Sequence, residues 1–201
     1  MEYRCVATSV AGFVQQLAVA YITHGYWFYV AGEIPEGKDP DAIDAKLIDR
    51  YGIAMSKWAR CRRKKQGLAN MQYLRHERFF VLLATKGWHE FFERENASIR
   101  DVRRAPIKFA SYSIGCRKGR DGQWHASVRI SPDRYEEIRR VAVSAVSRGD
   151  VVAVDTMIRS FMFPRCATIR RQLAQLVTTV NRHRRIAGRE IISTIHQVGV
   201  N

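Results

Sequence analysis

The spacing of hydrophobic residues changes along the chain, and each spacing predicts one kind of element. Residues 3–8 alternate loosely and predict a first strand. Ser9 then precedes apolar residues at helical spacing, so it is the expected N-cap, and Gly25 ends that helix. The run 26–31 (YWFYVA) is dense in aromatic and β-branched residues, as in a buried strand. The chain is therefore expected to begin with a strand, a helix and a second strand.

Further elements follow from the same spacing and from residues that start or stop helices. Asp39-Pro40 predicts a helix start, because proline fits the first helical position. The basic segment 56–66 predicts a short helix that stops at Gly67. The other expected strands are 71–74, 78–85, 107–116 and 123–130, and the other expected helices are 88–95, one that begins at Pro132, 151–161 and 166–187.

These elements together predict an α+β fold. We expect a mixed or antiparallel sheet with a strand–helix–strand start and hairpins, followed by a helical C-terminal region. Ser147–Asp150 interrupts the helical pattern. The interruption predicts a division into an α+β sheet domain, 1–147, and a helical region, 148–201, with a single domain as the alternative. At 201 residues, the chain is long enough for either arrangement.

One segment raises the question of a membrane span, because residues 5–32 carry no charge. A spanning helix needs about 20 apolar residues. Here Gln15, Gln16 and His24-Gly25 interrupt the apolar run, and its spacing changes near residue 24. The pattern favours a buried helix followed by a strand. No basic segment or small-residue cleavage site marks a signal peptide.

The four cysteines are scattered and form no C-x-x-C pair. Their spacing argues against a zinc site and against a disulfide-dense secreted scaffold. Free thiols in a reducing compartment are the simplest interpretation, so we expect a cytoplasmic protein without a membrane partner. The cysteines are Cys5, Cys61, Cys116 and Cys166.

The distribution of charge is the feature of the sequence that says most about function. The net charge is +15, and three stretches without any Asp or Glu, 50–76, 102–120 and 156–189, hold 22 of the 34 Lys and Arg residues. Cations this close together repel one another unless a polyanion neutralises them. Nucleic acid is the leading candidate, because binding to its phosphates releases condensed counterions.

The basic segment 56–66 is the first candidate binding element. Its cations surround the expected helix, so they cannot all face a core, and Trp58 is the expected anchor. A docking or localisation patch is the alternative. The expected nucleic-acid contacts are Lys57, Arg60, Arg62, Arg63, Lys64 and Lys65.

The last long helix is the second candidate. At 100° per residue, Ile169, Leu173, Leu176, Val177 and Val180 fall within one narrow arc. The opposite arc carries groups that bind phosphates and base edges. A solvated surface helix, with its arginines paired to acids such as those of 33–49, is the alternative. The expected contacts on this arc are Arg171, Gln175, Arg182 and Arg185, with Thr178 beside them.

Aromatic residues on the expected strands allow two interpretations. Tyr73, Phe79, Phe80 and Tyr112 lie near basic residues, and exposed strand aromatics stack on bases in single-strand binders. More often such residues belong to the core. The acidic segment 33–49 is expected to dock on a basic surface of the same fold or to limit non-specific binding.

Motifs for catalysis are weak. The chain has no P-loop, no G-x-G-x-x-G, no H-x-H and no H-E-x-x-H, so we predict no cofactor and no metal site. We expect a DNA- or RNA-binding protein, an accessory subunit of a ribonucleoprotein or mobile-element complex with a possible protein partner. A nuclease or transposase whose acids meet only in the folded state is one alternative. A structural subunit that docks on an acidic protein is another.

Overall fold

The computed structural model describes residues 3–160 and 166–191. Contacts divide the chain into two compact units, Met1–Ile107 with Ile114–Ser127, and Lys108–Ser113 with Val128–Asn201. Helices and antiparallel sheets give an α+β fold, as the sequence predicts. The predicted boundary between residues 147 and 148 stays a prediction, because contacts do not show whether either unit folds alone.

The N-terminal helix and the strand after it follow the predicted order. Ser9 caps α1 (Val10–Gln15) by accepting a hydrogen bond from the Gly12 amide, and the π-helical η1 (Gln16–Tyr21) and the 3-10 helix η2 (Ile22–His24) continue it. Gly25 ends the helix with a φ of 90°, and β1 (Phe28–Glu33) follows. The predicted strand at 3–8 is wrong, because this segment forms only a single parallel bridge, between Val6 and Arg75.

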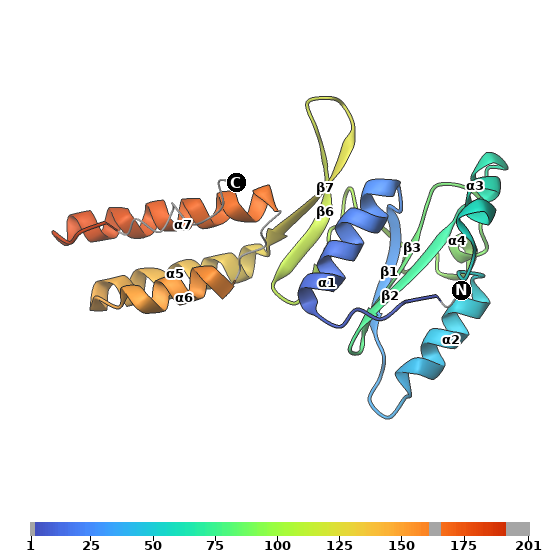
Figure 1. Ribbon diagram of the computed structural model, residues 1–201, viewed down its shortest axis with the longest axis horizontal. Coiled ribbons are helices and arrows are strands. Elements are labelled where there is room, and N and C mark those ends of the chain that lie inside the picture. The colour runs from blue at the N-terminus through green and yellow to red at the C-terminus, as the bar shows by residue number, and fades with distance from the viewer. Residues whose placement is uncertain (1–2, 161–165, 192–201) are drawn as a thin grey trace. The chain divides into compact units, whose positions relative to one another are not determined.

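A four-stranded sheet organises the first unit. Its order is β2 (Met71–His76), β3 (Phe79–Ala84), β1 and β4 (Arg100–Asp101), and the pairs are antiparallel. Tyr73 and Val30 both lie opposite Leu82 and therefore share one face with it. The other face meets α1, where the Phe13 ring lies 5.8 Å from that of Phe79 (Figure 1).

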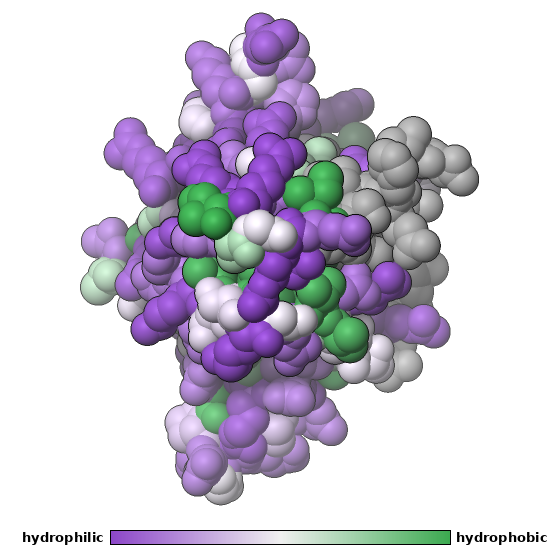
Figure 2. Space-filling view, turned by 90° about the vertical axis from the view of Figure 1, so that its left-hand side faces the viewer, coloured by the Kyte–Doolittle hydropathy of each residue, from purple (hydrophilic) through white to green (hydrophobic). Residues whose placement is uncertain are grey.

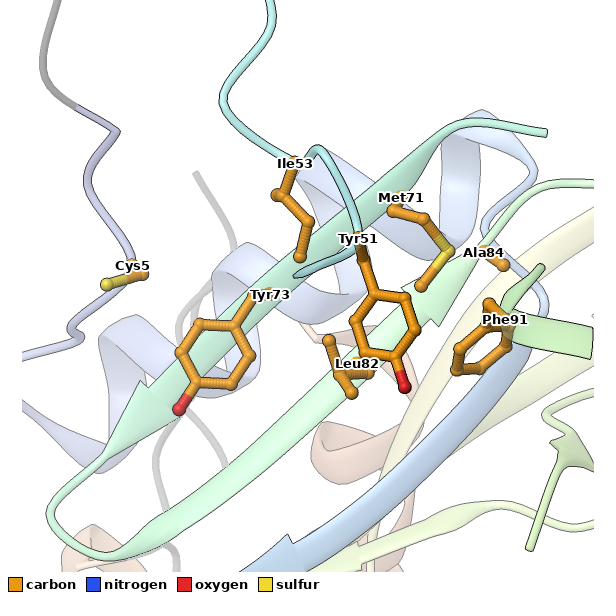
Figure 3. Packing of buried hydrophobic residues seen from close by; sticks show 8 residues of the cluster. All are labelled: Cys5, Tyr51, Ile53, Met71, Tyr73, Leu82, Ala84 and Phe91. Carbon is orange, nitrogen blue, oxygen red and sulfur yellow. The ribbon is translucent and has the colours of Figure 1, made fainter. Parts of the chain in front are cut away.

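Buried side chains fill the first of these faces. Met71 and Tyr73 of β2 and Leu82 and Ala84 of β3 project from the sheet toward the same side (Figure 3). Tyr51 and Ile53, which follow α2 (Pro40–Arg50), and Phe91 of α4 (Phe91–Arg94) cover them. α4 is much shorter than the predicted helix 88–95. The remaining member of the cluster is Cys5.

A buried ion pair joins the acidic segment to the sheet. Asp44 of α2 is 5% exposed and accepts hydrogen bonds from Arg75 Nε at 2.9 Å and from the Tyr73 hydroxyl at 2.6 Å. Asp41 also pairs with Arg75, at 2.7 Å. Part of the predicted acidic segment therefore docks on a basic residue of the same fold.

The second sheet has the order β5 (Ile107–Phe109), β6 (Tyr112–Lys118) and β7 (Trp124–Ile130). The sequence predicted one continuous strand over 107–116. The structure instead has a turn between β5 and β6, where Ala110 adopts a φ of 49°. The predicted hairpin around residues 117–122 is present between β6 and β7.

Three helices dominate the second unit. α5 (Pro132–Arg148) ends at Gly149 and packs on both α6 (Val151–Ser160) and α7 (Ala167–Ile186). The predicted helix end near 161 lies outside the described residues. Within the described chain, no helix combines the length and apolar character that a membrane crossing requires.

Candidate nucleic-acid interface

Helix α3 (Lys57–Lys65) forms where the sequence predicts it. The Ser56 hydroxyl caps it by accepting a hydrogen bond from the Ala59 amide at 3.2 Å. Gly67 follows the helix with a φ of 75°, a conformation that favours glycine. Within these limits lie all six predicted contact residues of the segment.

Two arginines, not a tryptophan, attach α3 to the fold. Arg60 donates to the carbonyl oxygens of Ile53 at 2.8 Å and Met71 at 2.9 Å. Arg63 donates to the carbonyl of Ala69 at 3.0 Å. The prediction that Trp58 anchors the helix is wrong, because its side chain is 76% exposed. Arg60 and Arg63 lie close to the other predicted contacts in sequence, but their guanidinium groups bind the backbone carbonyls of the fold.

The remaining four cations of α3 are exposed. At 100° per residue, Arg62 and Lys65 lie on the side of the helix away from Arg60 and Arg63, whereas Lys57 and Lys64 lie about 60° and 40° from Arg60 around the axis. Within the described part of the chain, no carboxylate forms an ion pair with any of them. These residues are Lys57, Arg62, Lys64 and Lys65.

A buried histidine lies close to the attachment point of α3. Burial and the nearby charge of Arg63 lower the pKa of His89 below its usual 6.5. Its Nδ1 accepts a hydrogen bond from the Phe91 amide at 3.1 Å, which requires an unprotonated Nδ1. His89 is therefore a neutral structural residue at pH 7, and the positive charge of this region belongs to Lys and Arg.

Helix α7 has the predicted two-faced character. Its five apolar stripe residues, Ile169, Leu173, Leu176, Val177 and Val180, are all buried. The side-chain amide of Gln172 fixes the helix against β7 through two hydrogen bonds with the main chain of Ile130, at 2.9 and 3.1 Å. The predicted contacts on the opposite arc are all exposed, namely Arg171, Gln175, Arg182 and Arg185.

The C-terminal half of this arc borders an open hollow of about 400 Å³. Thr178, Arg182 and Arg185 line it together with Asn181 and Ile186. Figure 2 shows mainly hydrophilic residues on the face turned to the viewer, with separate hydrophobic groups between them. α3 and α7 belong to different units.

Some cations of the three basic stretches pair with the protein's own acids. Among the 22, ion pairs in the described residues bind Arg75 to Asp44, Arg103 to Asp101 and Arg159 to Asp155. The Arg103 guanidinium also lies 4.3 Å from the ring centre of Trp27 and 5.7 Å from that of Trp124. Through these two cation–π contacts, Arg103 joins the β6–β7 hairpin to the four-stranded sheet.

Sequence reasoning missed two parts of the exposed surface. Arg117 and Lys118 at the end of β6 and Arg120 in the turn after it are exposed to solvent, and only the charge of the stretch 102–120 indicated this in the sequence. Trp88 is 63% exposed and was assigned no role. By contrast, base stacking by Tyr73 and Tyr112 is excluded, because both rings are buried in the core.

The described residues offer little for metal binding or for reactions of cysteine. In the described ranges, no group of three or more His, Cys, Asp or Glu side chains could hold a metal ion. All four cysteines are free thiols, as predicted. Burial raises the pKa of Cys5 and of Cys116 to about 11, so both are protonated at neutral pH.

Comparison with known proteins gives no relative: no protein family, curated protein or solved structure matches this chain.

Proposed function

We propose that this protein binds nucleic acid through the phosphate backbone. Two exposed basic faces support the proposal. One consists of Lys57, Arg62, Lys64 and Lys65 on α3, and the other of Arg171, Gln175, Arg182 and Arg185 on α7. Arg60 and Arg63 hold α3 in place and are left out of the binding face.

The observation that carries the proposal is the missing countercharge. Among the described residues, none of the seven Lys and Arg side chains on these two faces forms an ion pair with a carboxylate. A single exposed cation costs little free energy when only water surrounds it. Seven such side chains in two clusters, however, attract a polyanion strongly. Phosphate binding by such clusters gains free energy from released counterions.

The test compares the wild type with Arg171→Gln, Arg182→Gln and Arg185→Gln combined. Binding to a labelled duplex and to a labelled single strand is measured by anisotropy over a series of NaCl concentrations. We expect weaker binding to every sequence, and a salt slope smaller by about 1 for each arginine that contacts a phosphate. Full-strength binding would remove α7 from the interface.

A charge-matched control separates position from net charge. Arg94, Arg134 and Arg139 are exposed but pair with Glu90, Glu137 and Glu136, respectively. Their combined change to Gln lowers the net charge by the same three units. We expect this variant to keep most of the affinity. An equal loss in both variants would show that overall charge, rather than the α7 face, drives binding.

The same protein preparation tests the alternatives. Cleavage of the labelled strands in the presence of Mg²⁺ would support a nuclease or transposase. Weak retention on heparin, with a flat salt response, would favour docking on an acidic protein. The biological setting we propose is an accessory role in a ribonucleoprotein or mobile-element complex in the cytoplasm, which is in keeping with four free thiols.

A further inference from the structure

Two tryptophan side chains of the first unit are exposed. Trp58 is 76% exposed and Trp88 is 63% exposed, and within the described residues the other large exposed apolar side chains are Val or Ile. Tryptophan gains more free energy from burial than most residues. Leaving two of them in solvent, near the same basic helix, indicates that something covers them.

Trp58 lies on the exposed side of α3, away from the attachment of the helix to the fold. At 100° per residue, Arg62 and Lys65 lie within about 40° of it around the helix axis. Arg60 and Arg63, which donate to the fold's own carbonyls, lie on the opposite side. The indole is thus directed to solvent between two exposed cations.

Trp88 is held at the other end of the same helix. Its amide donates to the Gly67 carbonyl at 3.0 Å, and its carbonyl accepts from the Ala69 amide at 3.0 Å. The contact is close, because a Cβ atom on Gly87 would lie 2.6 Å from Gly67 O and from Ala69 N. The Trp88 backbone is therefore fixed beside the end of α3, and Lys86 is exposed two residues before it.

We propose that this face binds single-stranded nucleic acid by stacking unpaired bases on Trp58 and Trp88. Lys57, Arg62, Lys64, Lys65 and Lys86 then neutralise the phosphates on either side. The inference rests on the proposed function and narrows it to single strands. In a duplex the base faces are already stacked on one another, so exposed rings among cations suit unpaired bases of any sequence.

Charge favours a nucleic acid over a protein in this position. Tryptophan is also enriched at protein interfaces, but the centres of those interfaces are depleted of charged residues. Here five cations accompany two rings. The neighbouring acid Glu90 already pairs with Arg94 at 3.0 Å and so offers little countercharge.

The experiment measures binding of the full-length protein to a 20-nucleotide single strand, as DNA and as RNA, and to the duplex of the same sequence. Stacking on one ring changes affinity by about fivefold or more. We expect Trp58→Ala with Trp88→Ala to weaken single-strand binding at least 25-fold and to leave duplex binding within threefold. Phe at both positions should restore much of the loss, because it keeps a ring.

Two controls protect the interpretation. Val19→Ala removes another exposed apolar side chain, 60% exposed, and should change nothing. Melting curves should coincide for all variants, since both indoles are largely solvated; if the double alanine variant unfolds, the phenylalanine and single variants carry the test. Oligo(dT) should also quench tryptophan fluorescence in the wild type much more than in the double variant.

The outcomes separate this inference from the proposed function. If single strand and duplex bind equally and the tryptophan variants behave as wild type, the stacking face is refuted and nucleic-acid binding stands. If neither form binds, both fall. Binding to vesicles of anionic lipid, or to an acidic protein, without binding to either oligonucleotide would overturn both as well.

Discussion

Asp44 shows how one buried carboxylate influences the protonation and hydrogen bonding of its neighbours. It accepts hydrogen bonds from Arg75 and Tyr73, and the Cys5 Sγ lies 3.5 Å from its Oδ2. Burial and the hydrogen bond to Asp44 raise the pKa of Tyr73, so its hydroxyl stays protonated and keeps donating. The negative charge of Asp44 therefore faces a buried guanidinium across a fully hydrogen-bonded site.

We predict that Asp44→Asn lowers the free energy of unfolding by about 3 kcal/mol, because it leaves the buried Arg75 without its closest countercharge. Urea denaturation followed by circular dichroism measures the effect. Asp41→Asn is the matched control: its side chain also contacts Arg75 but is 87% exposed, so we expect a loss below about 1 kcal/mol. Equal losses in the two variants would contradict this assignment of roles.

At the scale of elements, α7 could be predicted from the sequence because the spacing of apolar residues within the helix is enough to define it. Five apolar residues at helical spacing fix the buried side, and the exposed side follows by geometry. The strand pairing could not be predicted in the same way. The split between β5 and β6 depends on a turn at Ala110-Ser111, where no glycine or proline marks the sequence.

α3 shows the opposite case. A lone tryptophan in a basic helix resembles an anchor, but Trp58 has Cys61 and Arg62 at positions i+3 and i+4, so it belongs to no apolar stripe. The real attachment uses Arg60 and the carbonyls of Ile53 and Met71, which only the tertiary fold brings together. For the proposed binding face, the sequence indicated the exposed cations but could not separate them from Arg60 and Arg63, which hold the helix in place.

We predict that Arg60→Met lowers the free energy of unfolding by about 2 kcal/mol, because two buried carbonyls lose charged donors. Arg60→Lys should not restore it, since one ammonium group does not reproduce the planar fork. Arg62→Met removes the same charge from the exposed side and should stay within about 0.5 kcal/mol of wild type. Thermal and urea unfolding of the three variants provide the comparison. Indistinguishable curves for positions 60 and 62 would show that Arg60 does not hold the helix.

At the scale of the whole molecule, a net charge of +15 acts on stability as well as on the proposed binding. Exposed ion pairs such as Arg134–Glu137 contribute little and lose little when salt screens them. Repulsion among the unpaired cations is the larger effect, and salt relieves it.

We predict that raising NaCl from 50 to 500 mM increases the melting temperature of the free protein by a few degrees. The same change should weaken the proposed complex with nucleic acid, so that the two responses have opposite signs. Differential scanning fluorimetry with and without an oligonucleotide measures both. A melting temperature of the free protein that falls with salt would mean that attractive pairs outweigh repulsion, against the assignment of the exposed basic faces.

The exposure of Cys61 has a practical consequence. It lies on the solvent side of α3, three residues after Trp58, whereas Cys5 is buried and Cys116 and Cys166 are partly covered. A maleimide dye should therefore attach first at Cys61 without any engineered thiol. Cys61 is thus a natural labelling site close to the Trp58 indole. A fluorophore attached there would report directly when a ligand binds to this side of α3.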